Sequence, residues 1–264
     1  MKESAPPKAD LVSAREAAKT LGVTVQTIKN YIYRGKMKSY KTPGGHHRIR
    51  REDIMNFGPV DDKPSRDEMM ESYTELYHGY IDTLQALTKA LDARDGIVSG
   101  HSRRVAAYTS SIARSLGFSQ EEMQVIELAA LLHDVGKVMI SEHILGKPGK
   151  LTEQEFYQIQ QHPVLGERIV EGANFLRETG PFIRHHHERF DGKGYPDGLA
   201  GEEIPLQARI LFLAEAFDCV RSDSSFHQGL SLDRSIELIT RESDTQFDPE
   251  IVKVFFNSLS TSGK

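Results

Sequence analysis

The chain has 264 residues, of which 38% are hydrophobic and 27% are charged, with one cysteine and no tryptophan. This length leaves room for two domains, because single cores stop growing at roughly 250 residues. No apolar run approaches the roughly 18 residues that cross a bilayer, and a lone cysteine, Cys219, excludes an internal disulfide. Residues 1–10 are polar and lack an apolar signal segment, so we expect a flexible start and a cytoplasmic protein. Cys219 itself is expected to be a small buried apolar residue.

Charge is distributed unevenly along the chain. Residues 1–57 hold 12 Lys/Arg against 5 Asp/Glu, and the remaining residues hold 21 against 33. A small basic segment on an acidic body indicates that only the N-terminal part meets a polyanion. A solvated charged face is the plainer alternative.

Residues 11–57 are predicted to form a compact unit that begins with two short helices. Ser13 followed by Glu16 is a capping box that starts the first helix, and Gly22 ends it. A second helix is expected from residue 25 to about residue 34, after a Leu-Gly-Val turn that is typical of a helix-turn-helix. This second helix carries side chains that can read base edges or hold phosphates: Gln26, Thr27, Asn30, Tyr31 and Arg34.

A basic hairpin is predicted behind these helices. Residues 38–41 and 46–50 are expected as short strands joined by a Thr-Pro-Gly-Gly turn, with another helix from residue 51. The strings "VSAREAAKTLGVTVQTIKNYIYRGKMKSY" and "TPGGHHRI" resemble the MerR/excisionase family of winged helix-turn-helix domains. That resemblance implies binding to duplex DNA through Gln26, Thr27, Tyr31 and Arg48. A protein-interaction or tethering module is the alternative.

Residues 58–65 are polar with two prolines and are predicted to be a linker, which leaves 66–264 as the second domain. Apolar residues recur at three- and four-residue steps from 66 to 94 and predict one leading helix about 40 Å long. Its apolar stripe pairs with a second copy in a homodimer, packs on its own domain, or does both along different parts. From residue 101 onward only helices are expected, over 102–116, 120–133, 153–160, 162–171, 204–221, 231–240 and 249–258. The predicted fold class is therefore mainly α, a small winged helix-turn-helix domain followed by an all-α helical bundle.

Histidines and acidic residues recur in the second domain within short motifs: "GHSRRV", "LLHDVGK", "QHP", "HHHERFDGKGYP" and "LAEAFDCV". Imidazole and carboxylate ligands together suit transition metals such as Fe, Mn, Co, Ni and Zn. An aspartate that bridges two ions about 3.5–4 Å apart is suited to phosphodiester hydrolysis, because the ions stabilise both the attacking and the leaving oxygen. Each histidine alone is more commonly a surface or core residue, so the prediction depends on their combination.

The combined pattern H…HD…D resembles the HD metal-dependent phosphohydrolase superfamily, and "HHHERFDGKGYPDGL" resembles its HD-GYP subfamily, over roughly residues 70–260. The resemblance implies an all-α bundle of the HD type and two metal ions with Asp134 bridging them. The implied ligands are His101, His133, Asp134 and Asp218 for one ion, and His162, His186 and His187 for the other. His185 is expected to support the site, although the histidine triplet leaves the register open by one residue.

The resemblance also assigns substrate contacts. Lys137 matches a lysine that contacts a phosphate or the bridging hydroxide, and as a cation near the end of a helix it also suits the helix dipole. Gly194, Tyr195 and Pro196, with Gly192, match the signature loop, where glycine allows close approach and tyrosine can stack. The implied reaction is the hydrolysis of cyclic di-GMP to pGpG, or on to GMP. Asp134 and Lys137 are the expected catalytic residues.

Two departures from the family pattern limit what the resemblance implies. Ile97 stands where some members carry a glutamate ligand, so two ions are expected and not three. Iron or manganese is expected rather than zinc. Ser224 and His227 replace two arginines that hold substrate phosphates. Weaker turnover, or a different dinucleotide such as cyclic GMP-AMP, would follow. The competing hypothesis is a transcription regulator that binds the dinucleotide with little or no hydrolysis.

Overall fold

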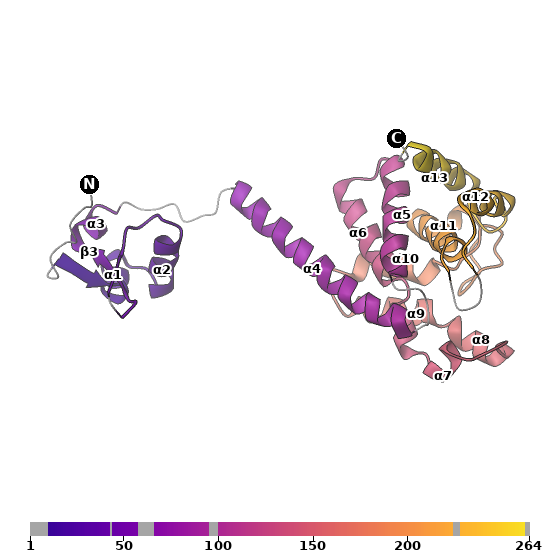
Figure 1. Cartoon of the computed structure of the whole chain (residues 1–264), viewed down its shortest axis with the longest axis horizontal. Helices are drawn as coiled ribbons and strands as arrows, with labels where there is room; N and C mark the ends of the chain where they lie inside the picture. Colours follow the sequence, from indigo (N-terminus) through magenta and orange to yellow (C-terminus); the bar gives the residue numbers. More distant parts are fainter. Residues whose placement is uncertain (1–9, 43, 58–65, 95–99, 224–227, 262–264) are drawn as a thin grey trace. The chain divides into compact units, whose positions relative to one another are not determined.

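The computed structural model describes residues 10–42, 44–57, 66–94, 100–223 and 228–261 (Figure 1). The chain divides into two compact units, Met1–Met70 and Glu71–Lys264. Helices dominate the described residues, and the few strands all lie in the first unit, which confirms the predicted fold class. Most of the predicted flexible start and all of the predicted linker, 58–65, lie outside the described residues. The domain bounds therefore stay predictions.

The first unit combines three helices with a small antiparallel sheet. Its elements are β1 (Leu11–Ser13), α1 (Ala14–Leu21), α2 (Val25–Tyr33), β2 (Tyr40–Lys41), β3 (His47–Arg50) and α3 (Arg51–Met55). The strand order is β1-β3-β2, with Leu11 opposite Arg50 and Tyr40 opposite Arg48. The predicted helix pair and hairpin are confirmed, whereas β1 was not predicted.

Local capping explains where the first helices begin and end. The backbone N–H of Glu16 donates to the hydroxyl of Ser13 at 3.2 Å, and the Glu16 carboxylate accepts from the backbone N–H of Ser13 at 2.8 Å. Gly22 ends α1 with φ 67°, a left-handed conformation that favours glycine. The buried side chains of this unit come from every helix, from two of the strands and from the segment between α2 and β2: Val12, Ala17, Ala18, Ile28, Tyr31, Met37, Ile49 and Ile54.

The second unit is all-helical in its described part. Its first helix, α4 (Arg66–Arg94), begins within the first unit and continues into the second. The other α-helices are α5 (His101–Ser115), α6 (Gln120–Leu132), α7 (Glu142–Leu145), α8 (Glu153–Ile159), α9 (His162–Glu171), α10 (Gly180–His185), α11 (Leu206–Arg221), α12 (Leu232–Arg241) and α13 (Pro249–Thr261). All eight helices expected from residue 66 onward are present. The two that were not predicted, α7 and α10, are too short to show a periodic pattern.

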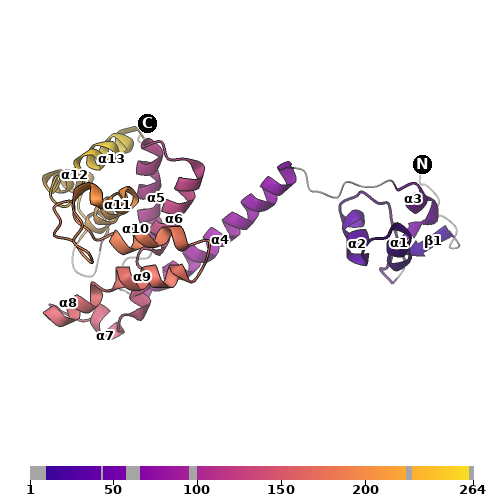
Figure 2. The same cartoon turned by 180° about the vertical axis from the view of Figure 1, so that it is seen from behind.

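Helices α5, α6 and α11 separate two hydrophobic clusters. One joins α4, α5, α6, α9, α10 and α11, and the other joins α5, α6, α11, α12 and α13. Figures 1 and 2 show α12 and α13 at one end of the bundle and α7 and α8 at the other. Ile81 and Leu84 belong to the first cluster, so the second half of α4 packs on its own domain. This packing brings the ends of α5, α6, α9 and α10 together beside α11.

Candidate metal centre

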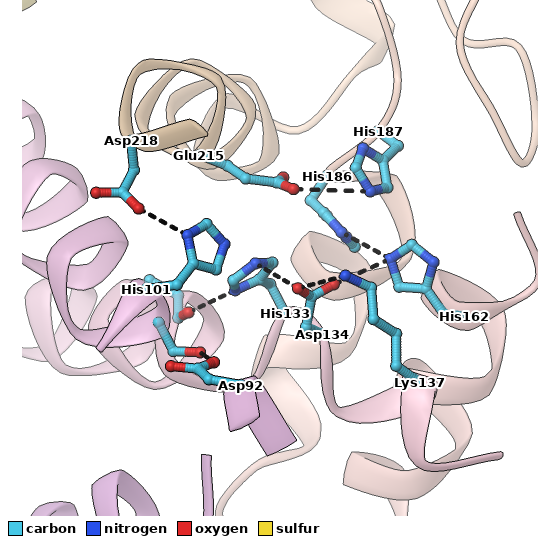
Figure 3. Close-up of polar contacts among 12 residues, drawn as sticks. Asp92, His101, His133, Asp134, Lys137, His162, His186, His187, Glu215 and Asp218 are labelled. Carbon is cyan, nitrogen blue, oxygen red and sulfur yellow. Dashed lines mark hydrogen bonds and ion pairs between the residues drawn. The ribbon is translucent and has the colours of Figure 1, made fainter. Parts of the chain in front are cut away.

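The predicted metal-binding residues converge in one buried place (Figure 3). His101 is the first residue of α5, and His162 is the first residue of α9. His133 and Asp134 lie between α6 and the 3₁₀ helix Val135–Met139. His186 follows α10 directly, and it is as buried as these four. Residues separated by more than eighty positions therefore meet where several helix ends lie close together.

Three of these histidines are oriented in the same way by the backbone. The Nδ1 atoms of His133, His162 and His186 lie 2.8, 2.7 and 2.6 Å from the carbonyl oxygens of Ala130, Ile159 and Ile183. In each case the carbonyl is three residues earlier, and it accepts a hydrogen bond from Nδ1–H. The contact leaves Nε2 as the free ligand atom, which is the usual arrangement of histidines that bind metals.

One ligand group consists of His162, His186 and His187, each of which offers one atom within 4.8 Å of the others. The two Nε2 atoms of His162 and His186 are only 3.2 Å apart. Burial is the main cause that lowers the pKa of His187 to about 4 and holds that of His186 well below its ordinary value. Both rings are therefore neutral near pH 7, as metal ligation requires.

A second ligand group consists of His101, His133 and Glu215. Asp134 lies between the two groups. Its Oδ2 is 3.3 Å from Nε2 of His133, and its Oδ1 is 3.3 Å from Nε2 of His162. Burial alone would raise the pKa of the Asp134 carboxyl, but Lys137 and His133 hold it well below its ordinary value. A carboxylate that faces one histidine of each group is placed as a bridging ligand would be.

Glu215 is the residue that sequence reasoning missed. It lies on α11 one helical turn before Asp218, so both carboxylates project from the same side of that helix. Glu215 is buried, and its Oε1 lies 3.9 Å from Nε2 of His187. Asp218, the predicted ligand, is close to His101 but contributes no atom to either group among the described residues. The available signal was the acidic residue one turn earlier in "LAEAFD".

Several buried polar atoms at this place have no hydrogen-bond partner within the described part of the chain: His133 Nε2, Asp134 Oδ1 and Glu215 Oε2. An unsatisfied buried polar group costs about 1–3 kcal/mol, so three such atoms together need a common explanation. Imidazole nitrogens and carboxylate oxygens around one space suit divalent transition metals. The residues present therefore fit a pair of ions.

Lys137 lies beside these ligand groups, and so does the signature loop around Gly194, Tyr195 and Pro196, here called the GYP loop. The ammonium group of Lys137 is 2.8 Å from Oδ2 of Asp134. The Tyr195 ring lies 4.8 Å from the His187 ring between centroids, and its backbone N–H donates to the His187 carbonyl at 3.2 Å. Gly194 approaches so closely that an added Cβ would lie 2.3 Å from the backbone nitrogen of Arg189.

Glu188 and Arg184 anchor the same loop. The buried carboxylate of Glu188 accepts from the backbone N–H groups of Asp197 and Gly198 at 2.7 and 3.0 Å. Arg184 holds the Asp197 carboxylate with two hydrogen bonds and also binds Glu167 on α9. His185 lies 3.0 Å from Asp197 through Nε2, which places it outside both ligand groups. The loop is therefore fixed against the histidine segment.

The predicted DNA-contacting residues have different exposures. Gln26 and Arg34 are exposed, and Thr27 and Arg48 are half-buried. Tyr31 is only 5% exposed, and its ring packs 5.2 Å from that of Phe57, so its ring belongs to the core of the first unit. This placement departs from the prediction that Tyr31 faces DNA, because the side chain fills the space between α2 and the end of α3.

Other expectations are corrected or fall outside the structure. Cys219 is exposed and not buried as expected. Ile97, Ser224 and His227 lie outside the described residues, so the departures from the family pattern rest on sequence alone. Within the described part of the chain, no helix combines the length and hydropathy that a membrane crossing requires.

Comparisons with known proteins agree with this site. A family model described as an HD domain matches residues 85–251. The chain belongs to the HD-domain family. A second family model, described as a helix-turn-helix domain, matches residues 11–57. Both matches confirm the resemblance that the sequence motifs carry.

Curated relatives of this HD-domain protein are phosphodiesterases by name. The cyclic di-GMP phosphodiesterase response regulator RpfG of Xanthomonas campestris pv. campestris is 39% identical over 186 residues, which are 70% of this chain and 49% of the relative. The 3'3'-cGAMP-specific phosphodiesterase 3 of Vibrio cholerae is 35% identical over 191 residues, 72% of this chain and 42% of the relative. A cyclic di-GMP phosphodiesterase of Thermotoga maritima is 35% identical over 187 residues, with 70% and 51% covered. The chain thus spans about half the length of these curated relatives.

Solved structures support the fold of the HD-domain unit. A cyclic GMP-AMP specific phosphodiesterase of V. cholerae superposes with a TM-score of 0.54 at 22% identity, over 67% of this chain and 48% of that one. An HDG"Y"P protein of Bdellovibrio bacteriovorus superposes with a TM-score of 0.52 at 16% identity, over 81% and 83%. At these identities the likeness concerns the fold alone.

Proposed function

We propose that this HD-domain protein is a metal-dependent phosphodiesterase that hydrolyses cyclic di-GMP to pGpG and GMP, coupled to a DNA-binding domain. The observation that carries the proposal is the convergence of His101, His133, Asp134, His162 and His187 on one buried space with unsatisfied ligand atoms. The curated relatives named as cyclic di-GMP phosphodiesterases support the substrate class. HD-domain hydrolases depend on bound metal, and the donor set here suits that chemistry.

Two divalent transition-metal ions would be held by the two ligand groups, with Asp134 between them. When bound, such a pair supplies Lewis-acid stabilisation of the reacting phosphate and activates the attacking water. Iron and manganese are favoured by the mixed nitrogen and oxygen ligands, and zinc, cobalt and nickel are the other candidates. The chain's own contribution is to fix Nε2 of His133, His162 and His186 through backbone carbonyls.

Lys137 and the GYP loop are proposed to bind the dinucleotide. The ammonium group of Lys137 lies at the Asp134 carboxylate, where negative charge develops on the phosphate during hydrolysis, and it would stabilise that charge. Tyr195 lies against His187 at the edge of the ligand groups and offers an aromatic face for a base. Gly194 and Pro196 would keep the backbone of the loop close to the ligand.

Hydrolysis assays test the proposal directly. The purified protein is incubated with Mn²⁺ or Fe²⁺ and either cyclic di-GMP or 3'3'-cGAMP, and the products are separated by chromatography. We expect pGpG and GMP from cyclic di-GMP, and no product from the Asp134→Ala variant, which should also lose bound metal on elemental analysis. Turnover retained by Asp134→Ala would exclude the proposed centre, and cleavage of 3'3'-cGAMP alone would correct the substrate.

A dinucleotide-responsive regulator is the second candidate function. It is favoured by the helix-turn-helix match at residues 11–57 and by Ser224 and His227, which stand where the family carries phosphate-binding arginines. Losing two charge-assisted contacts of about 1.5–3 kcal/mol each would weaken substrate binding. Measurable binding of cyclic di-GMP without hydrolysis, combined with a change in DNA affinity, would favour this function over the enzyme.

Duplex DNA and a second copy of the chain are the proposed macromolecular partners. The exposed Gln26 and Arg34 on α2 support the first, because a helix of this type enters the major groove. Exposed apolar side chains along α4 support homodimer formation: Met69, Met70, Tyr73, Leu76 and Leu87. Both a DNA partner and a nucleotide substrate fit a cytoplasmic protein.

A further inference from the structure

Asp218 is a carboxylate with 1% exposure on α11, and both of its oxygens already have partners in the protein. Oδ2 lies 2.7 Å from Nδ1 of His101 and 3.0 Å from a terminal guanidinium nitrogen of Arg104. Oδ1 accepts from Nε of the same arginine at 2.7 Å. The Arg104 fork thus binds the carboxylate with two parallel hydrogen bonds, which is the strongest geometry available to this pair.

The contact with Asp218 determines which nitrogen of His101 can bind a metal. An ionised carboxylate only accepts hydrogen bonds, so Nδ1 of His101 carries the proton. The two hydrogen bonds from Arg104, one to each carboxylate oxygen, favour the ionised form of Asp218. Nε2 of the His101 ring is then the nitrogen available to the group formed with His133 and Glu215.

His101 differs from the other histidines in how it is oriented. His133, His162 and His186 each use a backbone carbonyl of their own segment. His101 instead uses a side chain from α11, 117 positions away. A histidine that binds a metal through one nitrogen commonly donates its other N–H to a carboxylate, which fixes both the tautomer and the ring orientation.

We infer that Asp218, held in place by Arg104, is a positioning residue that directs Nε2 of His101 toward the metal ion of the His101, His133 and Glu215 group, here called the first ion. Asp218 does not bind that ion itself. The inference rests on the proposed metal centre. Asp218 can bind an ion only by giving up hydrogen bonds to His101 and Arg104, whereas Glu215 has a buried oxygen with no hydrogen-bond partner in the described chain. Glu215 therefore supplies the carboxylate of this ligand group.

Metal titration of Asp218→Asn tests the inference. Asparagine keeps the size of the side chain and one acceptor oxygen, but its NH₂ group must face either Arg104 or His101. We expect the affinity for the first Mn²⁺ ion to fall about 10–100-fold, as for other residues that orient a ligand. Two ions per chain should still bind at saturating Mn²⁺, because no ligand has been removed.

The absorption spectrum of the Co²⁺-loaded protein separates positioning from ligation. Asp218→Asn should keep the wild-type Co²⁺ bands at saturation, since the ligand atoms are unchanged. Glu215→Gln should shift those bands or leave one ion unbound at every concentration. Arg104→Gln should lower the affinity for the first ion, as Asp218→Asn does, but by a smaller factor. This substitution removes hydrogen bonds to Asp218 and leaves the contact between Asp218 and His101 in place.

Asp248→Asn is the matched control. Asp248 is also buried and paired with an arginine of α11, Arg209, but none of its contacts involves a ligand residue. Its substitution should leave Mn²⁺ affinity within twofold of wild type. A loss of affinity in Asp248→Asn as large as that in Asp218→Asn would overturn the inference, because general destabilisation would then explain both.

The tautomer of His101 in the metal-free protein provides a readout that does not need a working enzyme. Nitrogen-15 NMR should find the Nδ1–H form in wild type and a loss of that preference in Asp218→Asn. An Nε2–H form in wild type would overturn the inference. The inference would also fail if Asp218→Asn lost the first ion at saturating Mn²⁺ while Glu215→Gln still bound it. Failure of the wild type to bind metal or cleave cyclic di-GMP would instead reject the proposed function. The NMR measurement of the His101 tautomer would still test the contact between His101 and Asp218.

Discussion

At the scale of single residues, the site depends on which of two acids on α11, Glu215 or Asp218, is already held by other side chains. His101, His133, His162 and His186 follow from sequence strings, and the structure brings all four together. The choice between Glu215 and Asp218 could not be made from sequence. Both acids lie on one side of α11, and only the three-dimensional position of Arg104 and His101 shows that one carboxylate is already engaged. The longer side chain of Glu215 reaches His101 and His133, and the spacing of residues along the sequence does not predict this reach.

Lys137 offers a residue-scale test of catalysis. Lys137→Met should lower kcat for cyclic di-GMP by about 10²–10³-fold, the usual effect of removing one group that stabilises developing negative charge. Metal content should stay near two ions, because no ligand is lost. The rate is measured with saturating Mn²⁺ under single-turnover conditions. Lys147→Met serves as the control, since Lys147 pairs with Glu155 and contacts no ligand residue. Equal losses in both variants would argue against a direct role for Lys137.

Gly136 offers a residue-scale test of packing. A Cβ at this position would lie 1.9 Å from the backbone oxygen of His162 and 2.6 Å from the backbone nitrogen of Gly166. Gly136→Ala must therefore separate the segment after Asp134 from α9. We expect a loss of about 1–3 kcal/mol or more in unfolding free energy, together with weaker Mn²⁺ binding, as measured by urea denaturation and metal titration.

Gly172→Ala, near the end of α9, is the control for Gly136→Ala. Its added Cβ would meet only the Ile169 oxygen, at an ordinary contact distance of 3.4 Å, with φ −66°. Its unfolding free energy should stay within about 1 kcal/mol of wild type. Wild-type stability of Gly136→Ala would show that the two segments can move apart freely.

At the scale of elements, long periodic segments could be predicted and short ones could not. Residues 66–94 and the helices from α5 to α13 of seven residues or more show repeating apolar positions, whereas α7 and α10 are too short to do so. β1 is stabilised by pairing with β3, whose residues come more than 30 positions later, so no local pattern marks it. Tyr31 shows the same limit, because the core of the first unit and not the helix pattern determines its burial.

The GYP loop is the element whose anchoring responds to acid. Hydrogen bonds from Arg184 and then His185 lower the pKa of the Asp197 carboxyl from 3.8 to about 2. A carboxyl with a lowered pKa in the folded state stabilises the fold above its unfolded pKa, and the contribution disappears as the pH falls through the folded value. The stabilisation by Asp197 is therefore complete above about pH 4 and lost toward pH 2.

Urea denaturation of wild type and Asp197→Asn at pH 6, 4 and 3 measures this effect. The difference in unfolding free energy between the two proteins should be largest at pH 6 and shrink at pH 3. The half-exposed position keeps the difference small. Glu171→Gln is a control for general acid effects, because Glu171 is an exposed carboxylate at the end of α9, outside the loop. A difference that grows on acidification would contradict the proposed anchoring.

At the scale of the whole molecule, the exposed apolar side of α4 is the feature that links the proposed DNA and dimer functions. Tyr73, Leu76 and Leu87 are exposed, and their spacing of three and eleven residues keeps them on one side of the helix. Leu76, 73% exposed, is the most exposed of these. Leu76→Lys should convert a dimer to a monomer in analytical ultracentrifugation. His78→Lys, with the same new charge on the opposite side of α4, should remain dimeric.

The salt dependence of DNA binding then tests whether the dimer is the DNA-binding species. The logarithm of the DNA affinity falls with the logarithm of the salt concentration with a slope of about −0.9 for each phosphate contact. Two helix-turn-helix domains on one duplex make twice as many contacts as one, so wild type and His78→Lys should have about twice the slope of Leu76→Lys. The affinities are measured by fluorescence anisotropy between 50 and 200 mM salt, a range in which such differences are large. Equal slopes for all three proteins would mean that each chain binds DNA alone, and the apolar side of α4 would then have another partner.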